Sequence, residues 1–245
     1  MSTKNGALVS TFHVKQTSMK RVERLRLRAT EETMQCIVAG TGTGVGKSYV
    51  TAALARWLKQ QNRNPVCWKP IETGCKRHGA GLIGEDVELL RLSCGSECSP
   101  LYLFERPASP LSAASAVGKS IDFELLLKKT ASLRESAPTL MIETAGGVRV
   151  PLTPTHDNLA LMKLAGLPVL LVGTASLGTI NHTCLSADAL LGSGIRVPVI
   201  VLSKRPQEES GFAEENRREI ERLTGVPTVL FSESTVAGIV DRFAS

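Results

Sequence analysis

The sequence lacks a long hydrophobic run, a second pair of closely spaced cysteines and a low-complexity linker. No apolar run approaches the roughly 20 residues of a transmembrane helix, so we expect no membrane partner. Cys94 and Cys98 form a single C-x-x-x-C pair, and without a second pair they do not predict a zinc site. Reduced thiols in a cytoplasmic protein are the better interpretation of the scattered cysteines: Cys36, Cys67, Cys75, Cys94, Cys98 and Cys184.

The net charge of +6 is concentrated at one end of the 245 residues. Residues 1–33 contain seven basic and three acidic side chains, whereas residues 34–245 contain 22 basic and 20 acidic ones. The nearly neutral remainder does not support a nucleic-acid partner. The basic extension has no secretory apolar core, which leaves a transit peptide, a disordered tail or upstream sequence before the native start. Met34 precedes the first predicted strand and favours the last two.

Short apolar runs alternate with helical stretches after residue 34. Strands are predicted at 36–39, 66–68, 140–143, 169–172, 197–202 and 229–231, and helices at 47–61, 84–93, 111–118, 123–136, 157–165, 181–192, 213–224 and 235–243. Most strands are continuously apolar, which is typical of strands covered on both faces. No linker or repeat divides the chain. We therefore predict one α/β domain over residues 34–245, with a parallel sheet and helices on both faces.

A glycine-rich loop follows the first predicted strand. The run Gly40-Thr41-Gly42-Thr43-Gly44-Val45-Gly46-Lys47-Ser48 leads directly into a helical stretch. This construction predicts a nucleoside-triphosphate phosphate loop, in which backbone N–H groups and a helix N-terminus hold phosphates. Lys47 would reach the outer phosphates and the Ser48 hydroxyl would bind Mg²⁺. Five residues separate Gly40 from Gly46, one more than in the usual pattern.

Two further strand ends carry charged side chains. Ligands of parallel α/β sheets bind at the carboxyl ends of the strands, where Trp68-Lys69-Pro70 and Glu143-Thr144-Ala145 stand. Lys69 is either a solvated lysine or a second cation beside the phosphates. Glu143 suits a carboxylate on Mg²⁺. Asp86, early in a predicted helix, is either a metal ligand or a helix N-terminal charge.

A polar segment, Leu177-Gly178-Thr179-Ile180-Asn181-His182-Thr183, follows the strand at 169–172. Thr179 or Asn181 is expected to cap the next helix, which would leave N–H groups for a carboxylate. His182 could act in acid–base chemistry, although a single histidine in a helix is more often structural.

Four segments together resemble dethiobiotin synthetase, the enzyme that closes the ureido ring in the penultimate step of biotin synthesis. They are GTGTGVGKS, WKPIETG, ETAGGVRVPL and LGTINHT, and the likeness extends roughly from residue 35 to residue 202. The family's phosphate loop has the same five-residue spacer. The resemblance implies the phosphate-loop NTPase fold, ATP as co-substrate, Mg²⁺ as cofactor and a homodimer with its site at the interface.

The resemblance also implies roles for individual residues. Lys47 and Lys69 match the catalytic lysines, and Ser48, Asp86 and Glu143 match the Mg²⁺ ligands. The nucleotide-binding positions are Gly44, Val45, Gly46, Lys47, Ser48, Tyr49 and Ser203. The substrate positions are Thr43, Thr73, Gly146, Gly147, Val148 and Asn181, of which Asn181 would receive the substrate carboxylate from the partner subunit.

Three positions depart from the family pattern. Gly42 stands where the family usually has Asp, and Thr144 where it usually has Gly. Ser203 follows the fifth strand where the family commonly has Asn, which leaves the preferred nucleotide base open.

The implied reaction begins when one amine of 7,8-diaminopelargonate adds CO₂ to form a carbamate. The carbamate attacks the γ-phosphate of ATP, and the second amine then closes the ring and expels phosphate. Two alternatives share the fold. A partitioning ATPase would have a lysine at position 42, which is Gly42 here. A cobyrinate-synthase type amidotransferase usually adds a glutaminase domain, for which 245 residues leave no room.

Overall fold

The computed structural model describes residues 33–96, 99–204 and 211–243. The predictions made for residues 1–32 and for Cys98 lie outside the described residues. Within the described part of the chain, Cys36, Cys67, Cys75, Cys94 and Cys184 are free cysteines. None of the described helices is long and apolar enough to cross a membrane.

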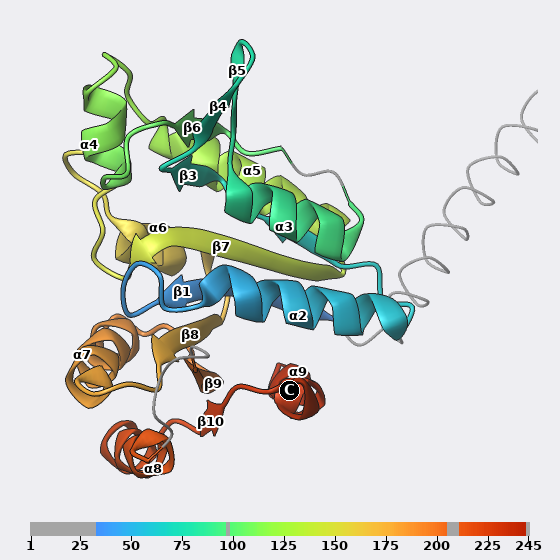
Figure 1. Cartoon of the computed structure of the whole chain (residues 1–245), viewed down its shortest axis with the longest axis vertical. Helices are drawn as coiled ribbons and strands as arrows, with labels where there is room; N and C mark the ends of the chain where they lie inside the picture. The colour runs from blue at the N-terminus through green and yellow to red at the C-terminus, as the bar shows by residue number, and fades with distance from the viewer. Residues whose placement is uncertain (1–32, 97–98, 205–210, 244–245) are drawn as a thin grey trace, which may run out of the picture. The chain divides into compact units, whose positions relative to one another are not determined.

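A six-stranded parallel sheet forms the centre of the described structure (Figure 1). Its order is β10-β9-β8-β1-β7-β2, with β1 at Met34–Gly40, β2 at Val66–Trp68, β7 at Thr139–Gly147, β8 at Val169–Thr174, β9 at Val199–Ser203 and β10 at Thr228–Leu230. All the strand pairs of this sheet are parallel. The predicted sheet is therefore confirmed, with strand ends shifted by a few residues.

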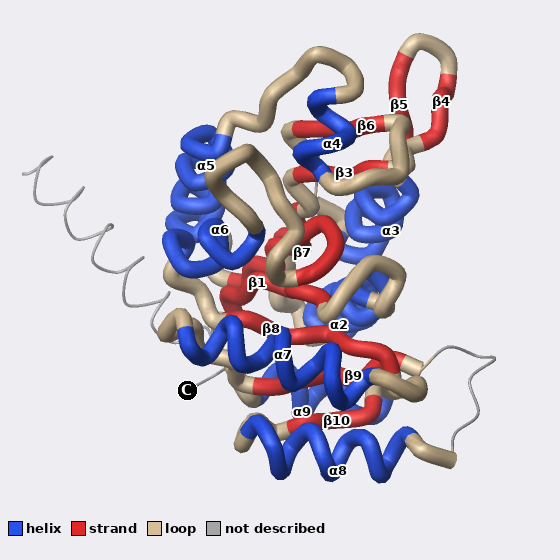
Figure 2. The backbone as a smooth tube through the Cα atoms, turned by 90° about the vertical axis from the view of Figure 1, so that its left-hand side faces the viewer, coloured by secondary structure: helices blue, strands red, loops and turns tan. Residues whose placement is uncertain are grey.

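Helices cover both faces of the sheet (Figures 1 and 2). They are α2 (Lys47–Gln60), α3 (Glu85–Cys94), α4 (Pro110–Ser115), α5 (Phe123–Ser136), α6 (Asn158–Ala165), α7 (Thr179–Gly192), α8 (Ala213–Thr224) and α9 (Val236–Asp241), with a 3₁₀ turn at Glu233–Thr235. The expected helix 111–118 is shorter than predicted, and the expected helix 235–243 is divided between the 3₁₀ turn and α9.

Successive residues of β1 contribute to two separate apolar cores. Val38 packs with α2, α3 and α9, whereas Ile37 packs with α4 to α8. Side chains of a strand alternate between faces, and both Ile37 and Val38 are fully buried. Because both faces of the sheet are buried, successive residues of these strands are apolar.

Two small sheets were not predicted. β3 (Ile71–Thr73) pairs in parallel with β6 (Tyr102–Phe104), and β4 (Lys76–His78) pairs with β5 (Gly81–Ile83) as an antiparallel hairpin. Each of these strands has only three residues, and β3, β4 and β5 lack the continuous apolar run by which the equally short β2 was recognised. They lie between β2 and α5 in sequence, and β3 begins two residues after Lys69.

The register of β1 and β7 places two glycine segments together. Gly40 is the partner of Gly147 across a local irregularity in the ladder. The phosphate loop leaves the sheet at Gly40, and the Gly146-Gly147 segment leaves it beside that loop. A Cβ atom on Gly147 would lie 3.5 Å from Cα of Gly42, so the two segments approach closely at the carboxyl edge.

We expect Leu54→Ala to destabilise the fold, because Leu54 of α2 is fully buried in the core between this helix and the sheet. Leu→Ala substitutions at such sites remove about 2–5 kcal/mol from the free energy of unfolding. The matched control is Leu92→Ala on α3, where the side chain is 69% exposed. Urea denaturation of both variants measures the difference, and equal losses would contradict this packing.

Candidate active site

The phosphate loop joins β1 to α2 and has a conformation that requires glycine at two positions. Gly44 has φ of 70° and Gly46 has φ of 95°, a region that side-chain-bearing residues rarely adopt. A Cβ atom on Gly46 would also lie 2.8 Å from Cβ of Ser203. Ser203, at the end of β9, therefore packs directly against the loop.

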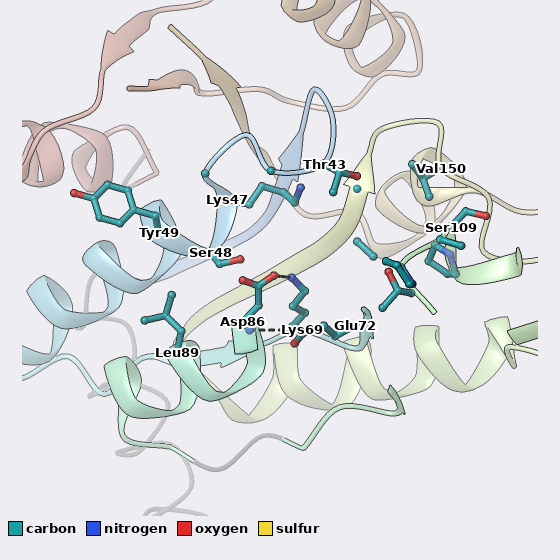
Figure 3. A pocket seen from close by; sticks show the side chains of 18 residues that line it. Thr43, Lys47, Ser48, Tyr49, Lys69, Glu72, Asp86, Leu89, Ser109 and Val150 are labelled. Carbon is teal, nitrogen blue, oxygen red and sulfur yellow. Dashed lines mark hydrogen bonds and ion pairs between the residues drawn. The ribbon is translucent and has the colours of Figure 1, made fainter. Parts of the chain in front are cut away.

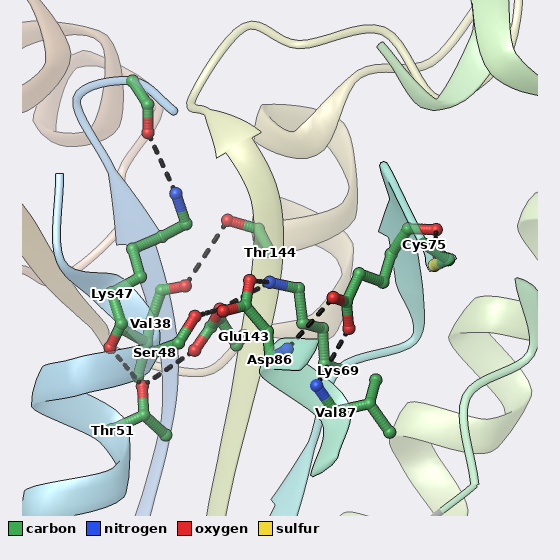
Figure 4. A network of polar contacts seen from close by, with 12 residues as sticks. Val38, Lys47, Ser48, Thr51, Lys69, Cys75, Asp86, Val87, Glu143 and Thr144 are labelled. Atoms are coloured by element: carbon green, nitrogen blue, oxygen red, sulfur yellow. Dashed lines mark hydrogen bonds and ion pairs between the residues drawn. The ribbon is translucent and has the colours of Figure 1, made fainter. Parts of the chain in front are cut away.

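Lys47 is the first residue of α2 and is 6% exposed. Its Nζ donates to the backbone carbonyl of Gly42 at 2.9 Å (Figure 4). Burial lowers the pKa of the Lys47 ammonium to about 8, an effect that the nearby Glu143 carboxylate partly opposes. A phosphate chain in the loop would bring negative charge to this ammonium and to the helix N-terminus.

Glu143 of β7 is the centre of the polar network in Figure 4. Its carboxylate is fully buried and accepts from the Ser48 hydroxyl at 2.6 Å, the Thr51 hydroxyl at 3.1 Å and Lys69 Nζ at 2.9 Å. Thr51 lies one turn after Lys47 in α2 and also donates to the Lys47 carbonyl. The three donors come from α2 and from the end of β2, so Glu143 joins these elements to β7.

Lys69 forms ion pairs with both Glu143 and Asp86 (Figure 4). Burial alone would lower the pKa of the Lys69 ammonium, but the two carboxylates outweigh burial and raise it. Burial likewise raises the pKa of the Asp86 carboxyl, and Lys69 outweighs it, so this pKa lies below its usual range. Lys69 is only 6% exposed, which excludes the solvated strand-end lysine.

Ser48, Asp86 and Glu143 form an oxygen donor set that fits Mg²⁺. One hydroxyl and two carboxylates are hard oxygen ligands, and Mg²⁺ is commonly held by one or two carboxylates and by substrate phosphates. In the structure the Lys69 ammonium contacts both carboxylates, which shows that the two groups converge on a cation. Asp86 lies in the first turn of α3. It can therefore be both a helix N-terminal charge and a member of this cluster.

A cavity of about 680 Å³ opens beside this cluster. Ten of the residues expected in the site line it (Figure 3): Thr43, Gly44, Gly46, Lys47, Ser48, Tyr49, Lys69, Thr73, Asp86 and Gly146. The Tyr49 ring packs edge-on against Phe231, with ring centroids 5.4 Å apart. These residues come from the carboxyl ends of three strands and from the helices that follow.

Other expected site residues lie behind or away from this cavity. Glu143 is buried beneath it, Gly147 packs on the phosphate loop, and Val148 is 4% exposed in the apolar core. Val45 is buried in the core on the α2 side of the sheet. Asn181 is exposed on the first turn of α7 and is absent from the lining.

The expected capping of α7 is wrong. Its N-cap is Gly178, in the left-handed region with φ of 87° and with no side-chain cap. Thr179 is instead the first helical residue, and its hydroxyl donates back to the carbonyl of Thr174 at 2.6 Å. His182 is exposed on the same helix and is not part of the cavity lining.

The residues on one side of the cavity were not predicted from the sequence. Pro107, Ala108, Ser109 and Pro110 line it together with Glu72, Leu89, Ala145 and Val150. The proline segment follows β6, a strand that was not predicted. Ser109 before Pro110 is a helix-start signal, and its hydroxyl accepts from the Ser112 N–H as the N-cap of α4. That signal alone could have indicated a loop here, although not its place at the site.

Gly42 and Thr144, two of the positions that depart from the family pattern, have different surroundings. A Cβ atom on Gly42 would meet only Val45 Cγ1, at 3.8 Å, so a side chain fits there. Thr144 is 2% exposed, and its hydroxyl donates to the carbonyl of Val38 on the neighbouring strand at 3.4 Å. Thr144 therefore supports the β1–β7 pairing and faces away from the cavity lining.

We expect Gly46→Ala to weaken nucleotide binding at least tenfold, because left-handed strain of about 1–2 kcal/mol adds to the overlap with Ser203. Gly42→Ala is the matched control in the same loop and should change affinity less than about twofold, since its Cβ would meet only Val45 Cγ1, at the ordinary contact distance of 3.8 Å. Calorimetric titration with ADP measures both. Equal losses would contradict the described loop conformation.

Comparison with known proteins agrees with the site. The AAA domain family model matches residues 34–232. A protein of Anaeromyxobacter dehalogenans named ATP-dependent dethiobiotin synthetase BioD is 37% identical over 192 residues, which cover 76% of this chain and 84% of that protein. A protein of the same name from Bacillus subtilis is 33% identical over 194 residues, covering 78% of this chain and 83% of that protein. A solved DUF1611 family protein from Anabaena variabilis shares the fold at TM-score 0.50 and 15% identity, covering 89% of this chain and 58% of that chain. By its relatives and its phosphate-loop fold, the chain belongs to the dethiobiotin synthetase family.

Proposed function

We propose that the protein carboxylates 7,8-diaminopelargonate and closes its ureido ring, consuming ATP and giving dethiobiotin, ADP and phosphate. The observation that carries this proposal is the cluster of Ser48 and Asp86 with the buried Lys69 and Glu143, beside a phosphate loop. The substrate is inferred from the family to which the chain belongs. The cavity beside the cluster has room for a small diamine next to the phosphates of a bound nucleotide.

The residues of the cluster have distinct parts in the proposed reaction. The phosphate loop and Lys47 bind the phosphate chain of ATP. Ser48, Asp86 and Glu143 would hold Mg²⁺, which neutralises charge on the β- and γ-phosphates when bound. Lys69 places a second ammonium at the same edge, where it stabilises charge on the transferring phosphoryl group. No residue needs to form a covalent bond, so positioning and electrostatics supply the catalysis.

The remaining steps of the proposed reaction pass through a carbamate. One substrate amine adds CO₂, and a carbamate oxygen attacks the γ-phosphate to give a carbamic–phosphoric anhydride and ADP. The second amine attacks the carbonyl of this anhydride, the ring closes and phosphate leaves. Thr43, Thr73 and Gly146 line the part of the cavity next to Lys69 and Lys47 and are proposed to contact the substrate.

Formation of dethiobiotin tests the proposal directly. The protein is incubated with diaminopelargonate, bicarbonate and MgATP, and the product is identified by mass spectrometry. ATP hydrolysis without product would favour a nucleotide-dependent switch protein instead. The same assay with GTP or CTP determines whether the change to Ser203 alters the preferred base.

We expect Lys69→Ala to lower kcat by at least about 100-fold, the scale seen when one transition-state donor is removed, while ADP binding persists through the loop. Lys76→Ala is the matched control, because Lys76 is an exposed lysine that pairs with Glu85 of α3. Ring-closure kinetics and calorimetry separate the two effects. Turnover of Lys69→Ala near the wild-type rate would remove Lys69 from the proposed mechanism.

We also propose a homodimer, in which Asn181 serves the site of the partner subunit. Asn181 is exposed and does not line the cavity of its own chain, as a residue contributed across an interface would be. Leu177 and Leu185 beside it are 90% and 61% exposed, which leaves apolar surface on this segment for a second copy.

Subunit mixing tests this arrangement. Asn181→Ala and Lys69→Ala are each expected to be nearly inactive, but a mixed dimer would contain one site with both native residues. Random mixing should therefore restore about a quarter of wild-type activity, since half of the dimers are mixed and each has one intact site. No recovery on mixing would contradict a shared site.

A further inference from the structure

Glu72 is a buried carboxylate that the proposed reaction does not use. It lies in β3, three residues after Lys69, and is 6% exposed. Its Oε1 accepts from the N–H of Asp86 at 3.0 Å and its Oε2 from the N–H of Val87 at 2.8 Å (Figure 4). Backbone N–H groups in the first turn of a helix have no partner within the helix. Glu72 thus caps α3 from another element.

Gly84 makes room for this contact. It is the N-cap residue of α3, in an extended conformation and with no side chain to accept from the helix. A Cβ atom on Gly84 would lie 2.6 Å from Cδ of Glu72, closer than such atoms approach in real structures. The carboxylate of Glu72 therefore occupies the space that a capping side chain at position 84 would fill.

The capped turn is the one that carries Asp86. Glu72 accepts a hydrogen bond from the backbone N–H of Asp86, and the Asp86 side chain forms an ion pair with Lys69. The position of the Asp86 carboxylate relative to Ser48 and Glu143 thus depends on where the first turn of α3 is held. Removing a group that is hydrogen-bonded to a metal ligand and orients it commonly lowers metal affinity about 10–100-fold.

We propose that Glu72 and Gly84 together position Asp86 for Mg²⁺, with Glu72 acting as a positioning residue that does not touch the reacting atoms. This inference rests on the proposed function, in which Asp86 binds Mg²⁺. Glu72 also lines the cavity, where it could contact an ammonium of the diamine. Both of its oxygens already accept from backbone N–H groups, which favours the positioning role.

The test measures Mg²⁺ binding without turnover, by calorimetric titration of Mg²⁺ into the protein saturated with ADP. Glu72→Ala is expected to raise the Mg²⁺ dissociation constant about 10–100-fold. Gly84→Ala should cause a similar loss, because it displaces the Glu72 carboxylate. The double variant should bind no more weakly than Glu72→Ala alone, since the clash vanishes with the carboxylate.

Two further variants keep the test decisive. Glu85→Gln removes a carboxylate from the same turn, but Glu85 is 70% exposed and pairs with Lys76, so Mg²⁺ affinity should stay within about twofold. Glu72→Gln keeps the volume and one acceptor, and should lie between wild type and Glu72→Ala even where the latter folds poorly. Its second group donates toward an N–H, so full wild-type affinity is not expected.

Three results would overturn the proposal. A lower melting temperature with unchanged Mg²⁺ affinity would make Glu72 a structural cap only. A raised KM for diaminopelargonate with unchanged Mg²⁺ affinity would make it a substrate contact. If the double variant lost Mg²⁺ affinity by the product of the two single losses, Gly84 and Glu72 would act independently, contrary to the proposal. Because the titration needs no product, failure of the wild-type protein to form dethiobiotin would refute the proposed function alone.

Discussion

The buried Glu143 carboxylate is the group on which the arrangement of the site depends. A fully buried charge is tolerated only when it is paired and hydrogen-bonded, and Glu143 has three donors, from Ser48, Thr51 and Lys69. These donors stand on α2 and at the end of β2, on either side of β7. Satisfying this one carboxylate therefore fixes the phosphate loop, the second lysine and the carboxyl edge of the sheet relative to one another.

Much of this arrangement was predictable because parallel sheets gather their strand ends at one edge. Lys47, Lys69 and Glu143 each follow or end an apolar strand, so recognising the strands was enough to bring them together. The phosphate loop adds a local signal, since its glycines are required by positive φ at Gly44 and Gly46. The order of the strands, with β1 between β7 and β8, follows from the structure alone.

The parts that escaped prediction depend on contacts distant in sequence or on short elements without a clear apolar pattern. β3 and β6 have three residues each and pair across about thirty residues of chain. Without them neither the proline segment at 107–110 nor Glu72 could be placed at the cavity. The cap of α3 is equally hidden, because its acceptor lies at Glu72 and position 84 shows only a glycine. The wrong cap for α7 has a related cause, since a left-handed Gly178 starts that helix without any side chain.

Charge balance stabilises the ionisable groups that lie together at the site. Lys47 and Lys69 oppose Asp86 and Glu143, so the cluster of two cations and two anions is neutral. Lys69 contacts both carboxylates. Lys47 has only the Gly42 carbonyl as its hydrogen-bond partner in the described network, and burial lowers the pKa of its ammonium to about 8, which the nearby Glu143 carboxylate only partly opposes. A phosphate chain bound in the loop would place an anion close to Lys47, and a divalent cation on Ser48, Asp86 and Glu143 would offset the excess of negative charge. Lys47 beside the phosphate loop and the carboxylates of Asp86 and Glu143 thus bring opposite charges to one site. The backbone position of Asp86 in turn depends on the first turn of α3, whose N–H groups donate to Glu72.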